Sequence, residues 1–316
     1  MRILFLSNRN TCLTKLNNER YWSCKVLSKH VEVKFWGLNW DGYNPNVTVQ
    51  ENIDTLPDKY DLAMAYKPLE MKKFKDINIP KVLRYNEMYD IKWTLKEIRE
   101  SGAQLVICHH LNDCELYQRH APAHLPDVKF VYVGHCADPT VFKNYNLPKE
   151  YDILLLGAIS PRYPLRQKFL ELLPYLRQKY KCHHHLHPGY ELKDSYTKRY
   201  LKEMAIAINK SRIALTDTGL PRTRYGKYVE IPMCGTSALC GDLPDDKADD
   251  YSYIIEVTNS MSLREIMDKI SYYLDNEDKR LEKVQKGIEF AKKYTWEHYV
   301  ERLLKVFREF LQVKNL

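Results

Sequence analysis

Residues 151–166 read YDILLLGAISPRYPLR, and this stretch decides the fold class. Asp152–Leu156 is a run of apolar residues behind one aspartate, which is typical of a strand buried on both faces of a parallel sheet. Gly157 ends the run, and Pro164 suits the first turn of a following helix. The stretch therefore predicts a strand–turn–helix unit of an α/β protein.

The same alternation of apolar runs and helical patterns extends along the rest of the chain. Further strands are expected at Ile3–Leu6, Val31–Trp36, Leu62–Ala65, Lys81–Arg84, Leu105–Cys108, Phe130–Val133, Lys181–Leu186, Ile213–Thr216, Ser237–Leu239 and Tyr253–Val257. Strands that alternate with helices favour mostly parallel sheets joined by right-handed crossovers. A chain of 316 residues usually exceeds one hydrophobic core, so two α/β domains are expected.

Pro148 and its polar neighbours interrupt the apolar runs and mark the domain boundary. We expect a first domain over residues 1–148 and a second over residues 149–295. Residues 296–316 carry apolar side chains at helical spacing, which predicts an amphipathic helix that packs back on the first domain. Peripheral contact with a membrane surface is the lesser alternative for this helix.

The charge and the cysteines exclude several classes of protein. The net charge of +8 is spread over both halves without a basic arm, so nucleic-acid binding is not expected. No apolar run approaches the roughly 20 residues of a membrane span. The apolar start turns polar at Ser7, too early for a signal peptide, and the eight cysteines form no C-x-x-C pair. A cytoplasmic protein with free thiols is therefore expected.

The loop and helix start after the 152–156 strand could bind phosphate. The chain contains neither G-x-G-x-x-G nor G-x-x-x-x-G-K-[ST], so the usual glycine-rich phosphate loops are excluded. A helix N-terminus with basic side chains is the alternative, and Gly157, Ser160, Arg162 and Arg166 supply that combination. Arginines at a surface helix start are equally compatible with no ligand at all.

A second informative stretch is LTDTGLPRTRYGKYVEIPMCGTSAL, residues 215–239, which holds three of the eleven glycines. Lys227 and Glu230 are three residues apart and share a face if this part is helical. Such a face could present a cation to phosphate and a carboxylate to ribose hydroxyls. On the residues alone, a solvated salt bridge between the two is the simpler interpretation.

At this point the chain resembles a known family. Residues 227–245, KYVEIPMCGTSALCGDLPD, are similar to the K/R-x-F-E-x-x-A-x-G-x-x-L-L-x-D segment of retaining-type glycosyltransferases with the GT-B fold. The closest group is the "glycosyl transferases group 1" branch that includes the CgeB-like proteins. Other elements of this family are resembled, in the same order, by Val133–Phe142, Tyr151–Arg166, His187–Tyr190, Ile208–Leu215 and Thr295–Glu297.

The resemblance implies two Rossmann-like domains facing a central cleft, with a nucleotide-diphosphate sugar held by the second domain. Glu230 would bind the donor ribose, Lys227 and the two arginines the diphosphate, and the loop after His187 the base. The donor-binding residues implied in this way are Gly157, Ser160, Arg162, Arg166, Gly189, Tyr190, Thr216, Lys227, Tyr228 and Glu230. The implied reaction transfers the sugar to a glycan or similar hydroxyl acceptor in glycan biosynthesis, with retention and without metal.

One position departs from the family pattern. Relatives that carry two glutamates seven residues apart would place the first at position 222, where this chain has Arg222. Asp217 is the candidate to replace that carboxylate as a catalytic group. Two other functions therefore stay open: a nucleotide-sugar epimerase of the same fold, and an inactive relative that only binds a glycan or a partner.

The first domain would bind the acceptor. His109 and His110 follow the 105–108 strand and are catalytic candidates, because a histidine can donate to a sugar hydroxyl or an oxyanion near neutral pH. A loop-capping histidine is the equal alternative, and Glu87 is a weaker candidate for an acceptor hydroxyl.

The histidines of 183–187 invite a zinc interpretation. No second ligand cluster accompanies them, so a polar-faced strand is favoured and no metal is expected. The acidic pairs Asp245-Asp246 and Asp249-Asp250 are expected to form a solvated loop.

Overall fold

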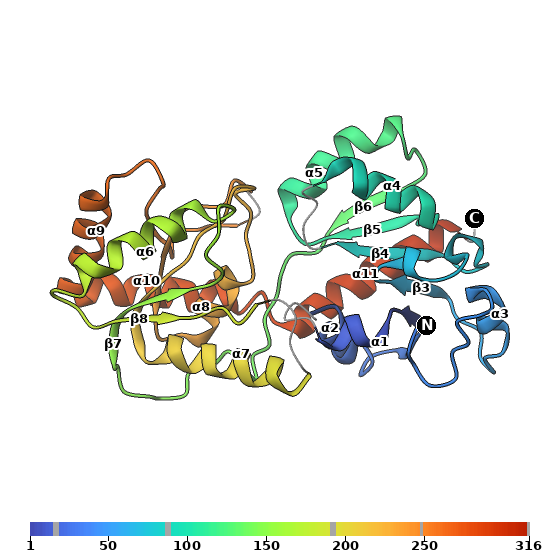
Figure 1. Cartoon of the computed structure of the whole chain (residues 1–316), viewed down its shortest axis with the longest axis horizontal. Helices are drawn as coiled ribbons and strands as arrows, with labels where there is room; N and C mark the ends of the chain where they lie inside the picture. The colour runs from blue at the N-terminus through green and yellow to red at the C-terminus, as the bar shows by residue number, and fades with distance from the viewer. Residues whose placement is uncertain (15–18, 86–89, 190–193, 247–248, 315–316) are drawn as a thin grey trace. The chain divides into compact units, whose positions relative to one another are not determined.

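The computed structural model describes residues 1–14, 19–85, 90–189, 194–246 and 249–314. They form two compact units, each built on its own parallel sheet (Figure 1). Unit 1 comprises Met1–Gly134 and Glu297–Leu316, and unit 2 comprises His135–Gly189 and Ser195–Trp296. The α/β class with two parallel sheets is therefore confirmed.

The sheet of unit 1 has six strands in the order β2-β1-β3-β4-β5-β6, all parallel. The strands are β1 (Arg2–Leu6), β2 (Glu32–Trp36), β3 (Leu62–Ala65), β4 (Lys81–Tyr85), β5 (Leu105–Cys108) and β6 (Lys129–Tyr132). The helices are α1 (Arg9–Thr14), α2 (Glu19–Leu27), α3 (Val49–Asp54), α4 (Ile91–Ser101), α5 (Leu111–His120) and α11 (Trp296–Lys314). Three short 3-10 turns, η1 (Pro68–Glu70), η2 (Phe74–Asp76) and η3 (Ala121–Ala123), complete the unit.

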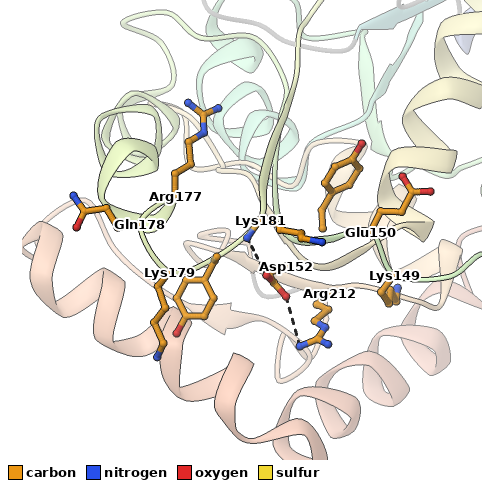
Figure 2. A pocket seen from close by; sticks show the side chains of 10 residues that line it. Lys149, Glu150, Asp152, Arg177, Gln178, Lys179, Lys181 and Arg212 are labelled. Atoms are coloured by element: carbon orange, nitrogen blue, oxygen red, sulfur yellow. Dashed lines mark hydrogen bonds and ion pairs between the residues drawn. The ribbon is translucent and has the colours of Figure 1, made fainter.

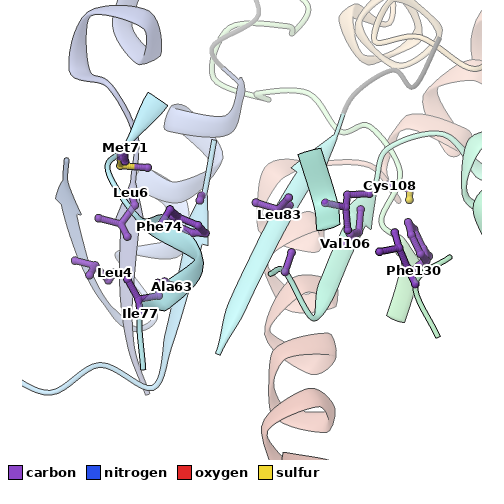
Figure 3. Close-up of a cluster of buried hydrophobic side chains, with 14 of the residues drawn as sticks. Leu4, Leu6, Ala63, Met71, Phe74, Ile77, Leu83, Val106, Cys108 and Phe130 are labelled. Atoms are coloured by element: carbon purple, nitrogen blue, oxygen red, sulfur yellow. The ribbon is translucent and has the colours of Figure 1, made fainter. Parts of the chain in front are cut away.

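Helices cover both faces of this sheet. Figure 3 shows one face, where Leu4, Leu6, Leu83 and Val106 of the strands lie in a buried apolar cluster. The cluster also contains side chains of α3, α4 and α5. On the other face, Cys24 of α2 contacts Met64. Because alternate strand residues point to opposite faces, strands covered on both sides are apolar throughout, as β3 and β5 are and as β1 is after Arg2.

The sheet of unit 2 has five parallel strands in the order β11-β10-β9-β7-β8. Its strands are β7 (Tyr151–Leu156), β8 (Cys182–His185), β9 (Ser211–Leu215), β10 (Ala238–Gly241) and β11 (Ile255–Glu256). Its helices are α6 (Pro164–Leu176), α7 (Asp194–Asn209), α8 (Lys227–Cys234), α9 (Leu263–Asp275) and α10 (Glu277–Ala291). Apolar residues of α6, α9 and α10 pack on one face of this sheet.

Strand β11 is shorter than the predicted Tyr253–Val257 run. The Ile254 N–H donates to the Tyr251 carbonyl in a turn, so pairing with β10 begins only at Ile255. Among the helices of the described residues, none combines the length and the apolar character that crossing a bilayer requires.

The parallel strands of unit 2 all end at one edge of its sheet. Gly157 follows β7, Thr216 follows β9 and Asp242 follows β10. In open parallel sheets this edge is where ligands bind, so the predicted donor residues gather where the fold favours a site.

Candidate functional site

Gly157 and the Arg166 side chain lie against each other at the end of β7. Gly157 has φ +98°, and a Cβ built on it would lie 2.5 Å from the Arg166 Nη1 atom. A glycine is therefore needed both for the backbone conformation and for the arginine to lie against the strand end. Pro164 starts α6 and so brings Arg166 within one turn of that position.

Gly157→Ala should destabilise unit 2 by about 1–3 kcal/mol more than Gly189→Ala does. Both glycines have a positive φ, so both substitutions strain the backbone, but a Cβ at Gly189 meets no atom within 4 Å. The difference in free energy of unfolding, measured in urea, isolates the clash with Arg166. Equal losses would show that the arginine moves aside without cost.

Arg166 binds Asp217 in a buried ion pair. The Nε and Oδ1 atoms are 2.8 Å apart, and the two side chains are 5% and 1% exposed. The guanidinium also donates to the carbonyls of Ala158, at 3.1 Å, and Asp217, at 3.2 Å. Burial raises the Asp217 pKa to about 6, although the Arg166 charge opposes that shift. Arg166, a predicted phosphate ligand, and Asp217, a predicted catalytic carboxylate, are therefore ion-pair partners in the structure.

Lys227 and Glu230 also pair, in the first turn of α8. Lys227 Nζ lies 2.9 Å from Glu230 Oε2, with the side chains 19% and 10% exposed. The pair is therefore largely enclosed, unlike the solvated salt bridge of the simpler sequence interpretation. The Glu230 carboxylate stands in the first turn of α8, at the positive end of the helix dipole.

Histidines lie close to this pair at the end of β8. Burial lowers the pKa of His185 and of His187 to about 4, and the nearby Lys227 charge lowers both further. His187 Nδ1 accepts a hydrogen bond of 3.1 Å from the N–H of Gly189, whose φ is +92°. Both imidazoles are therefore neutral at pH 7, and the charge beside them belongs to Lys227. Tyr190 lies outside the described residues.

The predicted donor residues Thr216 and Tyr228 are more deeply buried than the Lys227–Glu230 pair. Tyr228 is fully buried, and its hydroxyl donates to the Asp242 carbonyl at 2.7 Å. Burial raises its pKa well above the usual value. The Thr216 hydroxyl is buried and makes no hydrogen bond to any described residue. Gly241 passes so close that a Cβ there would lie 2.6 Å from the Thr216 carbonyl oxygen.

The glycine-to-helix loop before α6 is a compact turn. The Ser160 hydroxyl accepts from the Arg162 N–H at 3.3 Å, and the Ser160 carbonyl accepts from Tyr163 at 2.9 Å. The Arg162 carbonyl in turn accepts from the Leu220 N–H at 2.9 Å, which ties this loop to the one after β9. The Arg162 side chain itself is exposed.

Arg222, at the position where the family pattern has a glutamate, lies close to two aspartates. Its Nε lies 2.6 Å from Asp245 Oδ1, and its Nη1 lies 3.7 Å from Asp242 Oδ2. The expectation of a solvated acidic loop is wrong for two of its members. Asp246 is buried and accepts from the Tyr251 hydroxyl, and Asp249 accepts from Tyr294 at 2.6 Å. Phenol hydroxyls satisfy these carboxylates where water was expected.

In unit 1, His109 belongs to a buried cluster at the end of β5. Arg84 of β4 donates from Nε to His109 Nε2, and from Nη1 to the Ser23 hydroxyl at 2.7 Å. The His109 ring stacks on Tyr299 of α11, with centroids 5.6 Å apart. These contacts place the His109 ring between a guanidinium of the sheet and an aromatic ring of α11. The sequence analysis did not identify Arg84 as part of this cluster. A charged residue near the end of an otherwise apolar strand was the signal that could have indicated it.

His110 is 1% exposed and precedes the first turn of α5 without capping it through its side chain. Glu87 lies outside the described residues. Within those residues, no group of three His, Cys, Asp or Glu side chains comes together as a metal site would require.

Unit 1 also contains a hollow of about 490 Å³ at the carboxyl ends of β3 and β4, hereafter the unit 1 hollow. Its lining consists of Ala65, Tyr66, Lys67, Pro68, Leu69, Glu70, Leu83, Arg84, Tyr85, Trp93 and Glu97. The Tyr85 hydroxyl donates to the Glu97 carboxylate, and the Trp93 ring is half exposed. Sequence interpretation missed this hollow, whose signal was an aromatic residue at the carboxyl end of each of two strands, Tyr66 after β3 and Tyr85 as the last residue of β4.

Comparisons with known proteins bear on the fold and on the family similarity of the chain. Residues 166–305 match the family model described as "Glycosyl transferase-like". A search of curated protein sequences found no match.

Solved structures match over nearly the whole chain at low identity. Sucrose-phosphate synthase from Thermosynechococcus elongatus is 10% identical with a TM-score of 0.66, covering 99% of this chain and 100% of its own. WaaG, a glycosyltransferase involved in lipopolysaccharide biosynthesis, is 11% identical with a TM-score of 0.62, covering 96% and 99%. HepE from Anabaena in complex with UDP-glucose is 11% identical with a TM-score of 0.57, covering 98% and 100%.

These matches confirm the predicted GT-B fold and the resemblance to group 1 glycosyltransferases, without reaching the finer CgeB-like branch. The chain therefore has the GT-B fold, and its residues 166–305 are similar to the glycosyl transferase-like family.

Proposed function

We propose that the protein transfers a sugar from a nucleotide-diphosphate sugar to a hydroxyl group of a glycan or similar acceptor. The observation that carries this proposal is the enclosed Lys227–Glu230 pair at the start of α8, close to His185 and His187 at the end of β8. It offers a cation for a diphosphate and a carboxylate for ribose hydroxyls within one helical turn. HepE, which shares the fold, is described in complex with UDP-glucose, and this supports a uridine donor.

The proposed donor chemistry needs charge stabilisation on the leaving diphosphate. Lys227 and the dipole of α8 can supply it, because fixed dipoles and cations act strongly where water is excluded. We propose this metal-independent route, in which Arg166 holds Asp217 in place and does not touch phosphate itself. The neutral His185 and His187 can donate hydrogen bonds without adding charge.

The acceptor side of the proposal rests on the unit 1 hollow. Trp93 and Tyr66 offer aromatic faces for a sugar ring, and Glu97 with Tyr85 offers a polar pair for hydroxyl groups. Catalytic roles for His109 and His110 remain predictions, as does retention of the anomeric configuration. The eight free thiols support the proposal of a cytoplasmic site of action.

Trp93→Ala should raise the acceptor KM about tenfold, equivalent to about 1.4 kcal/mol, and leave the donor KM unchanged. Loss of one aromatic face removes contact area without disturbing the core, because the ring is half exposed. Tyr175→Ala, which removes an exposed aromatic ring from unit 2, is the matched control. An unchanged acceptor KM in the Trp93 variant would place the acceptor elsewhere.

The test of the reaction itself is calorimetry with UDP, GDP, ADP, CMP and TDP sugars, followed by NMR of the product with each donor that binds. Transfer to an added glycan, with the anomeric signal unchanged in configuration, supports the proposal. Turnover of the donor without any acceptor would indicate the epimerase instead. Binding of no nucleotide would favour the inactive glycan-binding relative.

A further inference from the structure

The sheet of unit 2 carries a recess at the edge opposite the predicted donor residues. It lies at the amino-terminal ends of β7, β8 and β9 and has a volume of about 440 Å³ (Figure 2). This size is within the usual range for a small-molecule site. We call it the amino-edge pocket.

Cations outnumber carboxylates in the amino-edge pocket. Its lining includes Lys149, Arg177, Lys179, Lys181 and Arg212, against Glu150 and Asp152. Five positive groups therefore face two negative ones.

Both carboxylates of the pocket already have partners. Asp152 accepts the Lys181 N–H at 2.9 Å and lies 3.5 Å from Arg212 Nη1, and Figure 2 shows it between those two residues. Glu150 lies 2.8 Å from Lys210 Nζ. Neither carboxylate is then left to neutralise the cations on the neighbouring turn.

One of the five cations is fixed by the main chain. Lys149 Nζ donates to the carbonyls of Asn209, Ser211 and Thr236, at 2.5–2.8 Å. Burial is the largest cause that lowers its pKa to about 8, and the charges of Arg280 and Arg212 lower it further. Its three donors are used, so it contributes charge to the pocket without offering a hydrogen bond.

Two cations of the turn between α6 and β8 are unengaged. Within the described part of the chain, the side chains of Arg177 and Lys181 form no ion pair, whereas Lys179 pairs with Asp275 at 3.4 Å. Both unengaged side chains are exposed. An arginine fork and a lysine ammonium are the groups that bind phosphate oxygens.

We propose that the amino-edge pocket binds a small phosphate monoester of about sugar-phosphate size. The excess charge requires an anion, and the volume exceeds what a bare phosphate fills. Tyr151, Tyr180 and Gln178 line the remainder and offer ring faces and polar groups to the organic part. This inference is independent of the proposed donor site, which lies at the other edge of the same sheet.

The experiment is calorimetry of the whole chain with glucose 6-phosphate, with glucose and inorganic phosphate as comparison probes. Glucose 6-phosphate should bind more tightly than either probe. The double variant Arg177→Gln with Lys181→Gln should weaken that binding at least tenfold. It should fold normally, because both side chains are exposed and neither forms an ion pair with a described residue. Lys202→Gln, which changes an exposed lysine of α7, should bind as the native protein does.

A third variant separates the two edges. Lys227→Ala should keep its affinity for glucose 6-phosphate, so a loss there would mean that the probe occupies the donor site and would overturn the proposal. Equal binding by the double variant, or no binding by the native protein, would overturn it as well. Co-sedimentation with phosphatidylglycerol vesicles that depends on Arg177 and Lys181, without glucose 6-phosphate binding, would assign the pocket to a lipid headgroup instead.

Discussion

Alanine in place of Arg166 is expected to destabilise the protein by about 3–5 kcal/mol in urea unfolding at pH 8. The substitution leaves the Asp217 carboxylate, 1% exposed, without the guanidinium that lies 2.8 Å away. A buried charge without its partner must either stay ionised at high cost or take up a proton. The Arg166→Ala substitution also removes the guanidinium hydrogen bonds to the Ala158 and Asp217 carbonyls. These hydrogen bonds join the ends of β7 and β9.

The pH dependence of this loss identifies its cause. The Asp217 pKa is about 6 in the folded protein, above its usual 3.8, so the folded state binds more protons between these values and the group's contribution to stability falls as pH rises. Without Arg166 the folded pKa rises further. The alanine variant should therefore lose less stability at pH 5 than at pH 8, because Asp217 can then be protonated.

Two controls accompany the measurement. Arg264→Ala breaks an exposed pair with Asp268 at 3.9 Å and should change stability by no more than about 0.5 kcal/mol. Arg166→Ala combined with Asp217→Asn should recover part of the loss at pH 8, since no charge is left buried. A loss that is the same at both pH values would show that packing of the arginine stem, and not its charge, stabilises the fold.

Lys227→Ala is expected to weaken binding of UDP about 10–100-fold, the effect of losing one charge-assisted hydrogen bond of about 1.5–3 kcal/mol. The substitution removes a contact with the diphosphate and none with the nucleoside, so the affinity for uridine should be unchanged. Glu230→Ala should weaken uridine and UDP by the same factor, because the ribose is common to both. This difference between the two probes assigns each residue to its part of the donor.

The matched control for this pair is Lys202→Ala, an exposed lysine in the same unit. Removal of Lys227 leaves Glu230 at a helix N-terminus, where its charge is tolerated, so the variant should fold and circular dichroism can verify that it does. If Lys227→Ala weakened uridine as strongly as UDP, the lysine would not be a phosphate ligand. Unchanged affinities in both variants would remove the pair from the donor site.

The fold could be predicted from the sequence because its signals are local. Each buried parallel strand is an apolar run, and the β7 strand with Gly157 and Pro164 contains its own start, end and following helix. The face shared by Lys227 and Glu230 follows from a spacing of three residues in a helix. Such features need no knowledge of how distant segments meet.

The side-chain partners within the sites depend on which strands are neighbours in the sheet. Arg166 and Asp217 are 51 residues apart in the chain, and they meet because β7 and β9 pair in the sheet. Arg84 reaches His109 because β4 and β5 are adjacent. The amino-edge pocket likewise needs β7, β8 and β9 side by side. Strand order follows from the whole topology, so these side-chain partners could not be read from short motifs.

Helix α11 has a consequence for the order in which the units can fold during synthesis. Its residues Tyr299, Val300, Leu303 and Phe307 are buried, and Glu297–Leu316 belongs to unit 1, whose sheet is made from the first 132 residues. On the ribosome, that sheet must wait with one apolar face incompletely covered while about 165 further residues are made, at roughly 5–20 residues per second. Unit 2 contains no such late segment, so the unit translated second is the first whose core can close.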